Sequence, residues 1–277
     1  RKWPKTGFFS KVIIYSFTLL SLLNLIKFYK KYSPDLIFCN LVGYLPNVLK
    51  YFSPKLVVVN SIQGLPKFNF FRKILWNFFY TKADYIFTMT EATKKNILDN
   101  INYKNKILKV DNPIINRNIR KLSHKSIVSN DKEMFNGITF CSVGRLTRQK
   151  NFLEILKAVN IVPREYHLKF RVIIIGDGED FNKLSDYLKK NNLQNIFLLG
   201  FKNNPYQYIE NSNYFISSSL WEEPGHAILE AGYLNKLIIS SDCPNGPKEI
   251  LKDNINSIKY RSGDYHRLAE IIESILR

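Results

Sequence analysis

Two glutamates that flank a turn are the residues of this chain whose type and spacing most directly suggest chemistry. Glu222 and Glu230 stand eight positions apart in the stretch SSSLWEEPGHAILEAG, residues 217–232. Carboxylates accept hydrogen bonds from hydroxyl groups, so the pair could hold two hydroxyl-bearing parts of one ligand. The same spacing is also typical of charges on a solvated helix.

The proline and glycine between the two glutamates predict that a helix begins near residue 225. The backbone N–H groups of Gly225, His226 and Ala227 would then point off its N-terminus, where anions bind. An anion held at this helix end would lie between the two carboxylates.

A basic loop follows the predicted strand that ends at Val143. Gly144 allows a tight turn, and Arg145 and Lys150 come before the next helical pattern, which Asn151 is predicted to cap. Two cations beyond the carboxyl end of a strand and beside a helix N-terminus suit a diphosphate. Taken alone, the loop also fits ordinary surface cations.

The sequence GDGED, residues 176–180, joins another strand pattern to a helical one. It is not the GxGxxG dinucleotide fingerprint, because Phe181 occupies the position of the third glycine. We therefore expect a tight strand-to-helix turn and no nicotinamide cofactor. The chain contains no DxD sequence, and its three cysteines form no CxxC or Cys/His cluster, so we expect no metal site.

Strand-like and helical patterns alternate along the whole chain. The strand patterns are DLIFCN, KLVVVNS, DYIFTMT, KILKVDN, GITFCSVG, FRVIIIGDG, IFLLG, YFISSS and KLIISSD. Helical patterns lie between them, at about residues 9–32, 68–82, 91–99, 151–162, 180–192, 205–210, 225–234 and 264–276. This alternation predicts right-handed βαβ units, parallel sheets and an α/β fold. The polar segment 116–137 lacks periodicity and predicts an interdomain linker, with a boundary near residue 135.

The length of 277 residues and the apolar fraction of 45% allow two domains with real cores. The charge is uneven: residues 1–140 carry 23 lysines and arginines against 7 acidic residues, whereas residues 141–277 carry 18 against 16. The net charges of +16 and +2 suggest that the first half meets an anionic surface, for which nucleic acid and acidic lipid are the candidates. The alternative is a compositional bias that serves solubility.

Two apolar segments bear on membranes. The stretch KFNFFRKILWNFFYTK, residues 67–82, mixes cations with aromatic residues and fits either a membrane interface or a core helix with a basic edge. The apolar run in residues 1–32 is interrupted by Ser16, Ser21 and Asn24 and has no small-residue cleavage site. We expect an amphipathic or buried helix there and not a membrane span.

Taken in order, VGRLTRQKN, IIGDGED, FLLGFKNN and SSSLWEEPGHAILEAG resemble the carboxyl-terminal half of the family 4 (group 1) retaining glycosyltransferases. ISSDCPNGPKEIL resembles the loop that follows, so the similarity covers residues 136–277. The resemblance implies the GT-B fold, with two Rossmann-like domains whose parallel sheets face a central cleft. Residues 1–135 would form the acceptor-side domain, without its opening strand and glycine-rich loop. Residues 136–277 would bind the donor.

The resemblance also implies roles for residues. Arg145 and Lys150 match the basic pair on the donor diphosphate, Glu222 matches the carboxylate on the donor sugar, and Glu230 matches the carboxylate on the ribose. We expect Glu222, Arg145 and Lys150 to carry catalysis. The other expected substrate-binding positions are Gly144 at the tight turn, Gly200 and Phe201 at the base pocket, and the backbone of Gly225, His226 and Ala227 at the distal phosphate and sugar.

By this resemblance the protein would move a sugar from a nucleoside diphosphate donor to a hydroxyl of a glycan or lipid-linked glycan, with retention of configuration. We expect a UDP-sugar in preference to a GDP-sugar, no metal or other cofactor, and no nucleic-acid partner. The expected setting is polysaccharide or lipopolysaccharide synthesis in the cytoplasm, peripheral to the membrane. The alternatives are a nucleotide-sugar epimerase on the same fold, or a non-catalytic remnant that binds membrane or nucleic acid.

Overall fold

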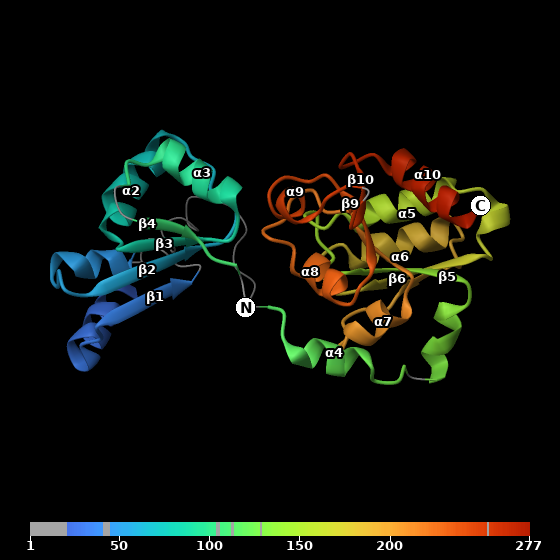
Figure 1. Ribbon diagram of the computed structural model, residues 1–277, viewed down its shortest axis with the longest axis horizontal. Coiled ribbons are helices and arrows are strands. Elements are labelled where there is room, and N and C mark those ends of the chain that lie inside the picture. The colour runs from blue at the N-terminus through green and yellow to red at the C-terminus, as the bar shows by residue number, and fades with distance from the viewer. Residues whose placement is uncertain (1–20, 41–44, 104–105, 112–113, 128, 254) are drawn as a thin grey trace. The chain divides into compact units, whose positions relative to one another are not determined.

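The chain divides into two compact units, Arg1–Asp111 and Asn112–Arg277 (Figure 1). The computed structural model describes residues 21–40, 45–103, 106–111, 114–127, 129–253 and 255–277. The first half of the helix predicted at residues 9–32 lies outside these ranges, and residues 21–32 are helical.

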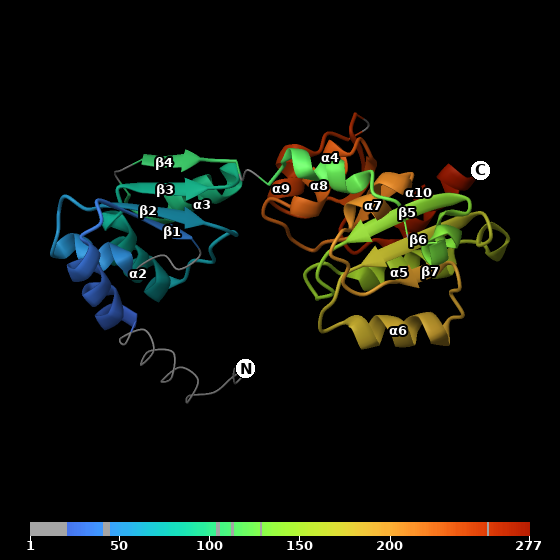
Figure 2. The ribbon, with the colours of Figure 1, turned by 90° about the horizontal axis from the view of Figure 1, so that it is seen from below.

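The first unit is built on a parallel sheet of four strands in the order β1-β2-β3-β4 (Figure 2). The strands are β1 (Leu36–Asn40), β2 (Val57–Ile62), β3 (Tyr85–Thr88) and β4 (Lys106–Lys109). Its helices are η1 (Pro46–Tyr51), α2 (Phe70–Phe79), η2 (Tyr80–Lys82) and α3 (Glu91–Asn100). Asn69 and Thr90 cap α2 and α3 through their side-chain oxygens, as N-cap residues do.

The second unit is built on a parallel sheet of six strands in the order β10-β9-β8-β5-β6-β7. The strands are β5 (Ile138–Val143), β6 (Phe170–Ile175), β7 (Ile196–Leu198), β8 (Tyr214–Ser217), β9 (Leu237–Ser241) and β10 (Ser257–Tyr260). Its helices are α4 (Arg117–Ser123), η3 (Ser129–Phe135), α5 (Phe152–Ile161), η4 (Arg164–Tyr166), α6 (Phe181–Lys190), α7 (Tyr206–Asn211), α8 (His226–Tyr233), α9 (Gly246–Ile250) and α10 (Tyr265–Leu276).

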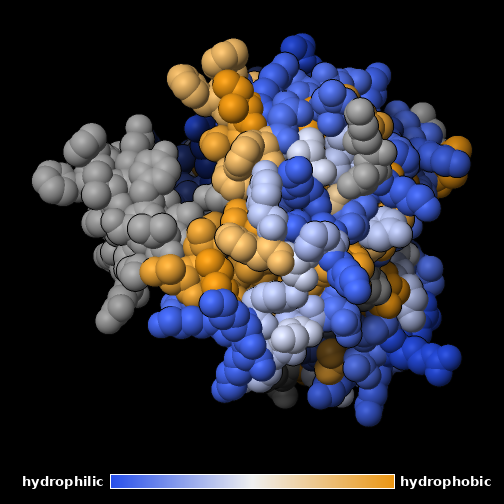
Figure 3. Space-filling model, turned by 90° about the vertical axis from the view of Figure 1, so that its left-hand side faces the viewer, coloured by the Kyte–Doolittle hydropathy of each residue, from blue (hydrophilic) through white to orange (hydrophobic). Residues whose placement is uncertain are grey.

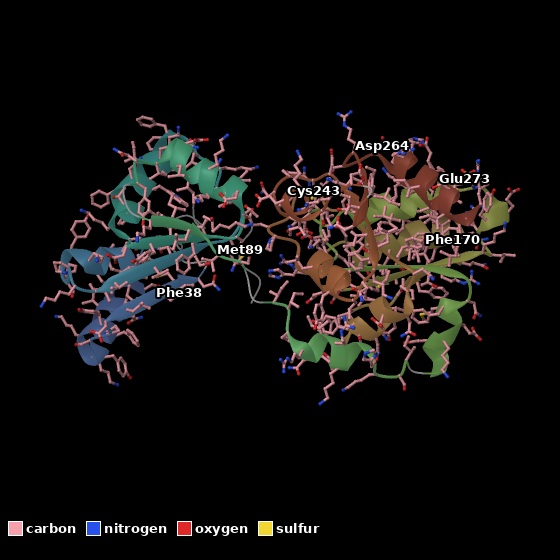
Figure 4. All side chains as sticks on the ribbon, viewed as in Figure 1. Phe38, Met89, Phe170, Cys243, Asp264 and Glu273 are labelled. Atoms are coloured by element: carbon pink, nitrogen blue, oxygen red, sulfur yellow. The ribbon has the colours of Figure 1, made fainter. Side chains whose placement is uncertain are left out.

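Helices cover both faces of this second sheet, with α5, α6 and α10 above it and α4 and α7 below it in Figure 1. Successive strand residues point to opposite faces. Phe140 therefore joins the core under α5 and α10, and Cys141 joins the core under α7 and α8. Phe170, at the start of β6, is fully buried in the first of these cores (Figure 4). The near-continuous apolar runs of the sequence follow from this two-sided burial.

The prediction of an interdomain linker at residues 116–137 was wrong, because this segment folds onto the second unit. Ile119 of α4 is only 1% exposed and lies in the core with α7 and α8. The side-chain amide of Asn204 donates to the carbonyl of Leu122 at 2.9 Å, and Arg120 donates to the carbonyl of Tyr233 at 3.2 Å. A short helix with a single buried apolar residue shows no hydrophobic periodicity in the sequence. These contacts place the division between units at Asp111, earlier than residue 135.

The cysteines Cys39, Cys141 and Cys243 are buried free thiols, as expected for small core residues. Burial raises the pKa of Cys39 and Cys243 to about 11 and that of Cys141 to about 12. Among the residues that the structure describes, no helix is both long enough and apolar enough to span a bilayer.

Candidate active site

The strand order places the candidate site at the carboxyl edge of the second sheet. β5 lies beside both β6 and β8, so the chain leaves β5 toward one side of the sheet and returns on the other. In open parallel sheets, ligands bind in the crevice at such a reversal point. The loops after β5 and β8 meet there, since Leu220 N donates to Gln149 O at 2.8 Å and Ser218 Oγ donates to Lys150 O at 3.0 Å.

An ion pair between Lys150 and Glu222 joins these two loops. Ser219 Oγ also donates to Glu222 Oε1, at 2.6 Å. Glu222 is only 5% exposed, and these partners offset the loss of water around its buried carboxylate. Both bonds go to Oε1, so Oε2 accepts no hydrogen bond from the described part of the chain. That oxygen is available to a ligand hydroxyl.

The N-terminus of α8 lies beside this ion pair. Gly225 is the N-cap residue and, as a glycine, offers no side chain to accept from the first N–H groups of the helix, so these groups could bind an anion. Burial and then the charge of Lys150 lower the pKa of His226, while Glu222 acts in the opposite direction. The lowered pKa favours the neutral imidazole of His226 at pH 7. The side chain lies close enough to Lys150 and Glu222 for their charges to affect its pKa.

Glu230 lies in the interior of α8 and has its own partner. Tyr206 Oη, from α7, donates to Glu230 Oε1 at 3.0 Å. Burial raises the pKa of Glu230, and the hydrogen bond from Tyr206 lowers it. Burial and the nearby carboxylate raise the pKa of Tyr206 to about 12, so the phenol remains a donor. The role of Tyr206 was not predicted from the sequence, because no local pattern connects residues 24 positions apart.

The GDG turn after β6 supports the basic loop after β5. Gly144 N donates to Ile175 O at 3.0 Å, and Leu146 N donates to Asp177 O at 2.9 Å. A Cβ atom at Gly176 would lie 1.8 Å from the carbonyl oxygen of Gly144, so only glycine permits this approach. The prediction of a tight turn is confirmed, and its role in supporting the neighbouring loop is a finding of the structure.

The two predicted cations are held differently. Lys150 is partly buried in its ion pair, and its aliphatic stem runs along Gly144, where a Cβ would lie 3.3 Å from Lys150 Cε. Arg145 is exposed, and no acidic side chain among the described residues pairs with it. Lys150 is thus fixed in place, whereas Arg145 keeps its charge available. Asn151 occupies the N-cap position of α5 but makes no side-chain cap, contrary to prediction; its amide donates to Glu154.

Gly200 and Phe201 follow β7 at the same edge of the sheet. The carbonyl oxygen of Gly200 accepts a hydrogen bond from Gly176 N at 2.9 Å, which connects this loop to the GDG turn. Phe201 is 73% exposed, so its ring is free to stack on a flat group.

The loop after β9 supplies further support for the turn that carries Glu222, which was not predicted from the sequence. Ser241 Oγ donates to Ser219 O at 2.6 Å, and Asn245 pairs with Glu222 through an isolated backbone bridge. A Cβ atom at Gly246 would lie 1.9 Å from the carbonyl oxygen of Pro224. The CPNG sequence therefore holds the turn that carries Glu222, and the only local signal for this was its glycine.

Two parallel-sheet units with such a site at a strand-order reversal define a protein of the GT-B fold. Alr3699/HepE of Anabaena, solved in complex with UDP and glucose, superimposes with a TM-score of 0.71 at 17% identity, over 92% of this chain and 71% of that one. A glycosyltransferase from Rickettsia africae gives 0.76 at 17% identity, over 99% and 73%. Residues 125–277 match the family model for glycosyl transferases group 1, and the chain belongs to that family.

Curated relatives agree with this assignment. An uncharacterized glycosyltransferase of Methanocaldococcus jannaschii, MJ1059, is 36% identical over 66% of this chain and 46% of its own length. A Campylobacter jejuni N-acetylgalactosaminyltransferase that is named for a diphospho-undecaprenol substrate is 24% identical over 79% and 60%. The chain thus spans about half the length of the curated relatives it matches.

Proposed function

We propose that the protein transfers a sugar from a nucleoside diphosphate donor to a hydroxyl of a glycan or lipid-linked glycan, with retention of configuration. Its relatives include a Salmonella typhimurium lipopolysaccharide 1,6-galactosyltransferase and a Staphylococcus aureus glycosyltransferase of capsular polysaccharide biosynthesis, which supports a role in cell-surface polysaccharide synthesis. The structural neighbour from Anabaena is complexed with UDP, which favours a UDP-sugar over a GDP-sugar as donor.

The arrangement of Lys150, Arg145 and the uncapped end of α8 carries this proposal. A leaving diphosphate develops negative charge, and fixed cations and helix N–H groups stabilise that charge without having to reorganise. Because these groups come from the protein itself, we propose that no metal ion is required. Glu222 Oε2 would accept a hydrogen bond from a donor-sugar hydroxyl, and Glu230 would accept from the ribose.

In the proposed reaction the bond between the anomeric carbon and the diphosphate oxygen breaks, and its electron pair leaves with the diphosphate. The acceptor hydroxyl forms the new bond on the same face of the sugar, so the configuration is retained. Its proton passes to the departing phosphate oxygen. The protein's contribution to this step is to bind, orient and stabilise charge, with no protein base.

The proposed setting is the cytoplasmic side of the membrane. Three buried free thiols, none paired with another, are in keeping with a reducing compartment.

A thermal-shift series with UDP, GDP and their sugars tests the donor site. A ligand that binds only the folded state at 100 times its Kd adds about 2.7 kcal/mol to the free energy of unfolding. We expect UDP to raise the Tm with or without EDTA and Arg145→Ala to abolish most of the rise. Arg148→Ala removes an exposed arginine of the same loop and is the matched control. Equal shifts in the wild type and Arg145→Ala would contradict the proposal.

Product analysis tests the reaction itself. We expect an α-linked product from an α-configured UDP-sugar, read from the anomeric coupling constant in NMR. A β-linked product would rule out retention, and conversion of the donor without any acceptor would rule out transfer.

A further inference from the structure

The outward side of helix α2 exposes five large apolar side chains, although the helix belongs to a well-packed unit. Their exposed fractions lie between 52% and 74%, and none of the ten residues of α2 is buried. At about 100° per residue, the five positions occupy one arc of about 140° around the helix axis. They are Phe70, Phe71, Ile74, Leu75 and Phe78.

The opposite side of α2 already supplies the contact with the core. Trp76 stacks on Tyr80 with ring centroids 4.0 Å apart and meets Phe68 edge-on at 5.0 Å. Trp76 and Phe68 pack against the buried cluster of the first unit. The exposed arc is therefore not the core-facing side of an amphipathic helix. It is a second apolar surface, of the kind that marks an interaction site.

Two further aromatic residues extend this surface beyond α2. Tyr51 and Phe52, at the end of η1, are 50% and 72% exposed. The rings of Tyr51 and Phe78 stack with centroids 6.0 Å apart, which joins the two elements. We call the seven side chains the α2 face. Figure 3 shows apolar side chains gathered in a band on the viewed side of the molecule, beside hydrophilic ones.

Cations predominate around the α2 face, where the acidic Asp84 pairs with Lys50 of η1 at 2.9 Å. No acidic residue occurs in the sequence between Asp35 and Asp84, whereas six lysines and arginines do. Lys67, Arg72, Lys73 and Lys82 are exposed, and Lys82 Nζ lies 5.1 Å from the centre of the Tyr51 ring. Aromatic and aliphatic side chains bordered by cations match the layers of an anionic bilayer, where acyl chains lie below phosphate headgroups.

We propose that the α2 face docks on the surface of an anionic lipid bilayer. The apolar side chains enter the boundary between headgroups and acyl chains, and the four cations contact the lipid phosphates. This excess of positive charge complements an anionic membrane in a way that it does not complement a second copy of this basic chain. The docking surface lies in the first unit and does not depend on the donor site.

Vesicle flotation tests the apolar part of this proposal. We expect the protein to float with vesicles of phosphatidylglycerol and phosphatidylcholine and to remain behind with phosphatidylcholine alone. The double variant Phe71→Ser/Leu75→Ser should lower the partition coefficient between vesicles and water at least about tenfold. Each replaced side chain no longer contributes the favourable free energy of moving its apolar surface from water into the bilayer. Leu168→Ser is the matched control, because Leu168 is an 84% exposed leucine of the second unit.

The double variant Lys73→Gln/Lys82→Gln tests the role of the positive charge. Its matched control is Lys183→Gln/Lys190→Gln, which removes two exposed lysines of α6. We expect only the first pair to reduce flotation, and added salt to weaken the wild type toward the level of that variant. Circular dichroism and the UDP-induced Tm shift show that the variants are folded. Three outcomes would each overturn the proposal. Flotation could be independent of lipid charge, or Phe71→Ser/Leu75→Ser could float like the wild type. The wild type could also form a concentration-dependent dimer that this variant abolishes.

Discussion

Lys150 and Glu222 form an ion pair across two loops that leave different strands, 72 residues apart in the sequence. Their side chains are only 19% and 6% exposed, so the pair is largely removed from water. It holds the two loops together at the point where the strand order reverses. It also sets the cation proposed for the diphosphate directly beside the carboxylate proposed for the donor sugar.

Removing one member of this pair should destabilise the protein more than removing both. We expect Lys150→Gln to lower the free energy of unfolding by about 3 kcal/mol, because Glu222 is left buried and unpaired. The double variant Lys150→Gln/Glu222→Gln should recover most of that loss. Urea unfolding measures both, with Lys183→Gln as the control at an exposed lysine. Additive losses would show that the two side chains do not interact.

Glu230 should affect nucleoside binding and not diphosphate binding. We expect Glu230→Gln to weaken UDP about tenfold, the scale of a hydrogen bond to a charged group, and to leave pyrophosphate affinity unchanged. Tyr206→Phe should weaken UDP in the same direction by less, since it removes only the hydroxyl that orients Glu230. Titration calorimetry with both ligands measures the ratio. Equal weakening of UDP and pyrophosphate would place Glu230 at the phosphates.

Two glycines should respond to alanine in opposite directions. Gly176→Ala forces a Cβ to within 1.8 Å of the Gly144 carbonyl oxygen, so the loop that carries Arg145 must move. We expect a loss of about 2 kcal/mol or more and weaker UDP binding. Gly232→Ala, inside α8, meets only Ile238 at 3.7 Å and should stabilise by up to about 1 kcal/mol. Thermal unfolding of the two variants compares them directly.

Glu154 should make stability depend on pH near neutrality. Burial raises the pKa of this α5 carboxyl from 4.5 to about 7, while hydrogen bonds from the Gly263 N–H and the Asn151 amide lower it in part. Between these values the folded state keeps a proton that the unfolded chain releases, so the contribution present below pH 4.5 is lost as pH rises through 7. Relative to wild type, Glu154→Gln should therefore gain stability from pH 5 to pH 8. Parallel Tm–pH curves would show that Glu154 does not titrate there.

Local patterns predicted most of the elements that position the site. The apolar run before Gly144 and the helix beginning after Gly225 are visible in a few consecutive residues, since period and turn chemistry act over short distances. The ordered set of motifs was enough to recognise the family that the comparisons then showed. The segment around α4 was mistaken for a linker, because Ile119 is the only fully buried apolar residue of that short helix.

By itself, the sequence determined the α/β class, the parallel strands and the side chains available at the strand ends, because these depend on composition and on spacing along the chain. Only the tertiary structure decided that Lys150 pairs with Glu222 and that Tyr206 orients Glu230. It also showed that the apolar side chains of the α2 face are exposed. Each of these depends on which distant segments the sheet order brings together, and the free energy of such contacts leaves no periodic trace in the chain.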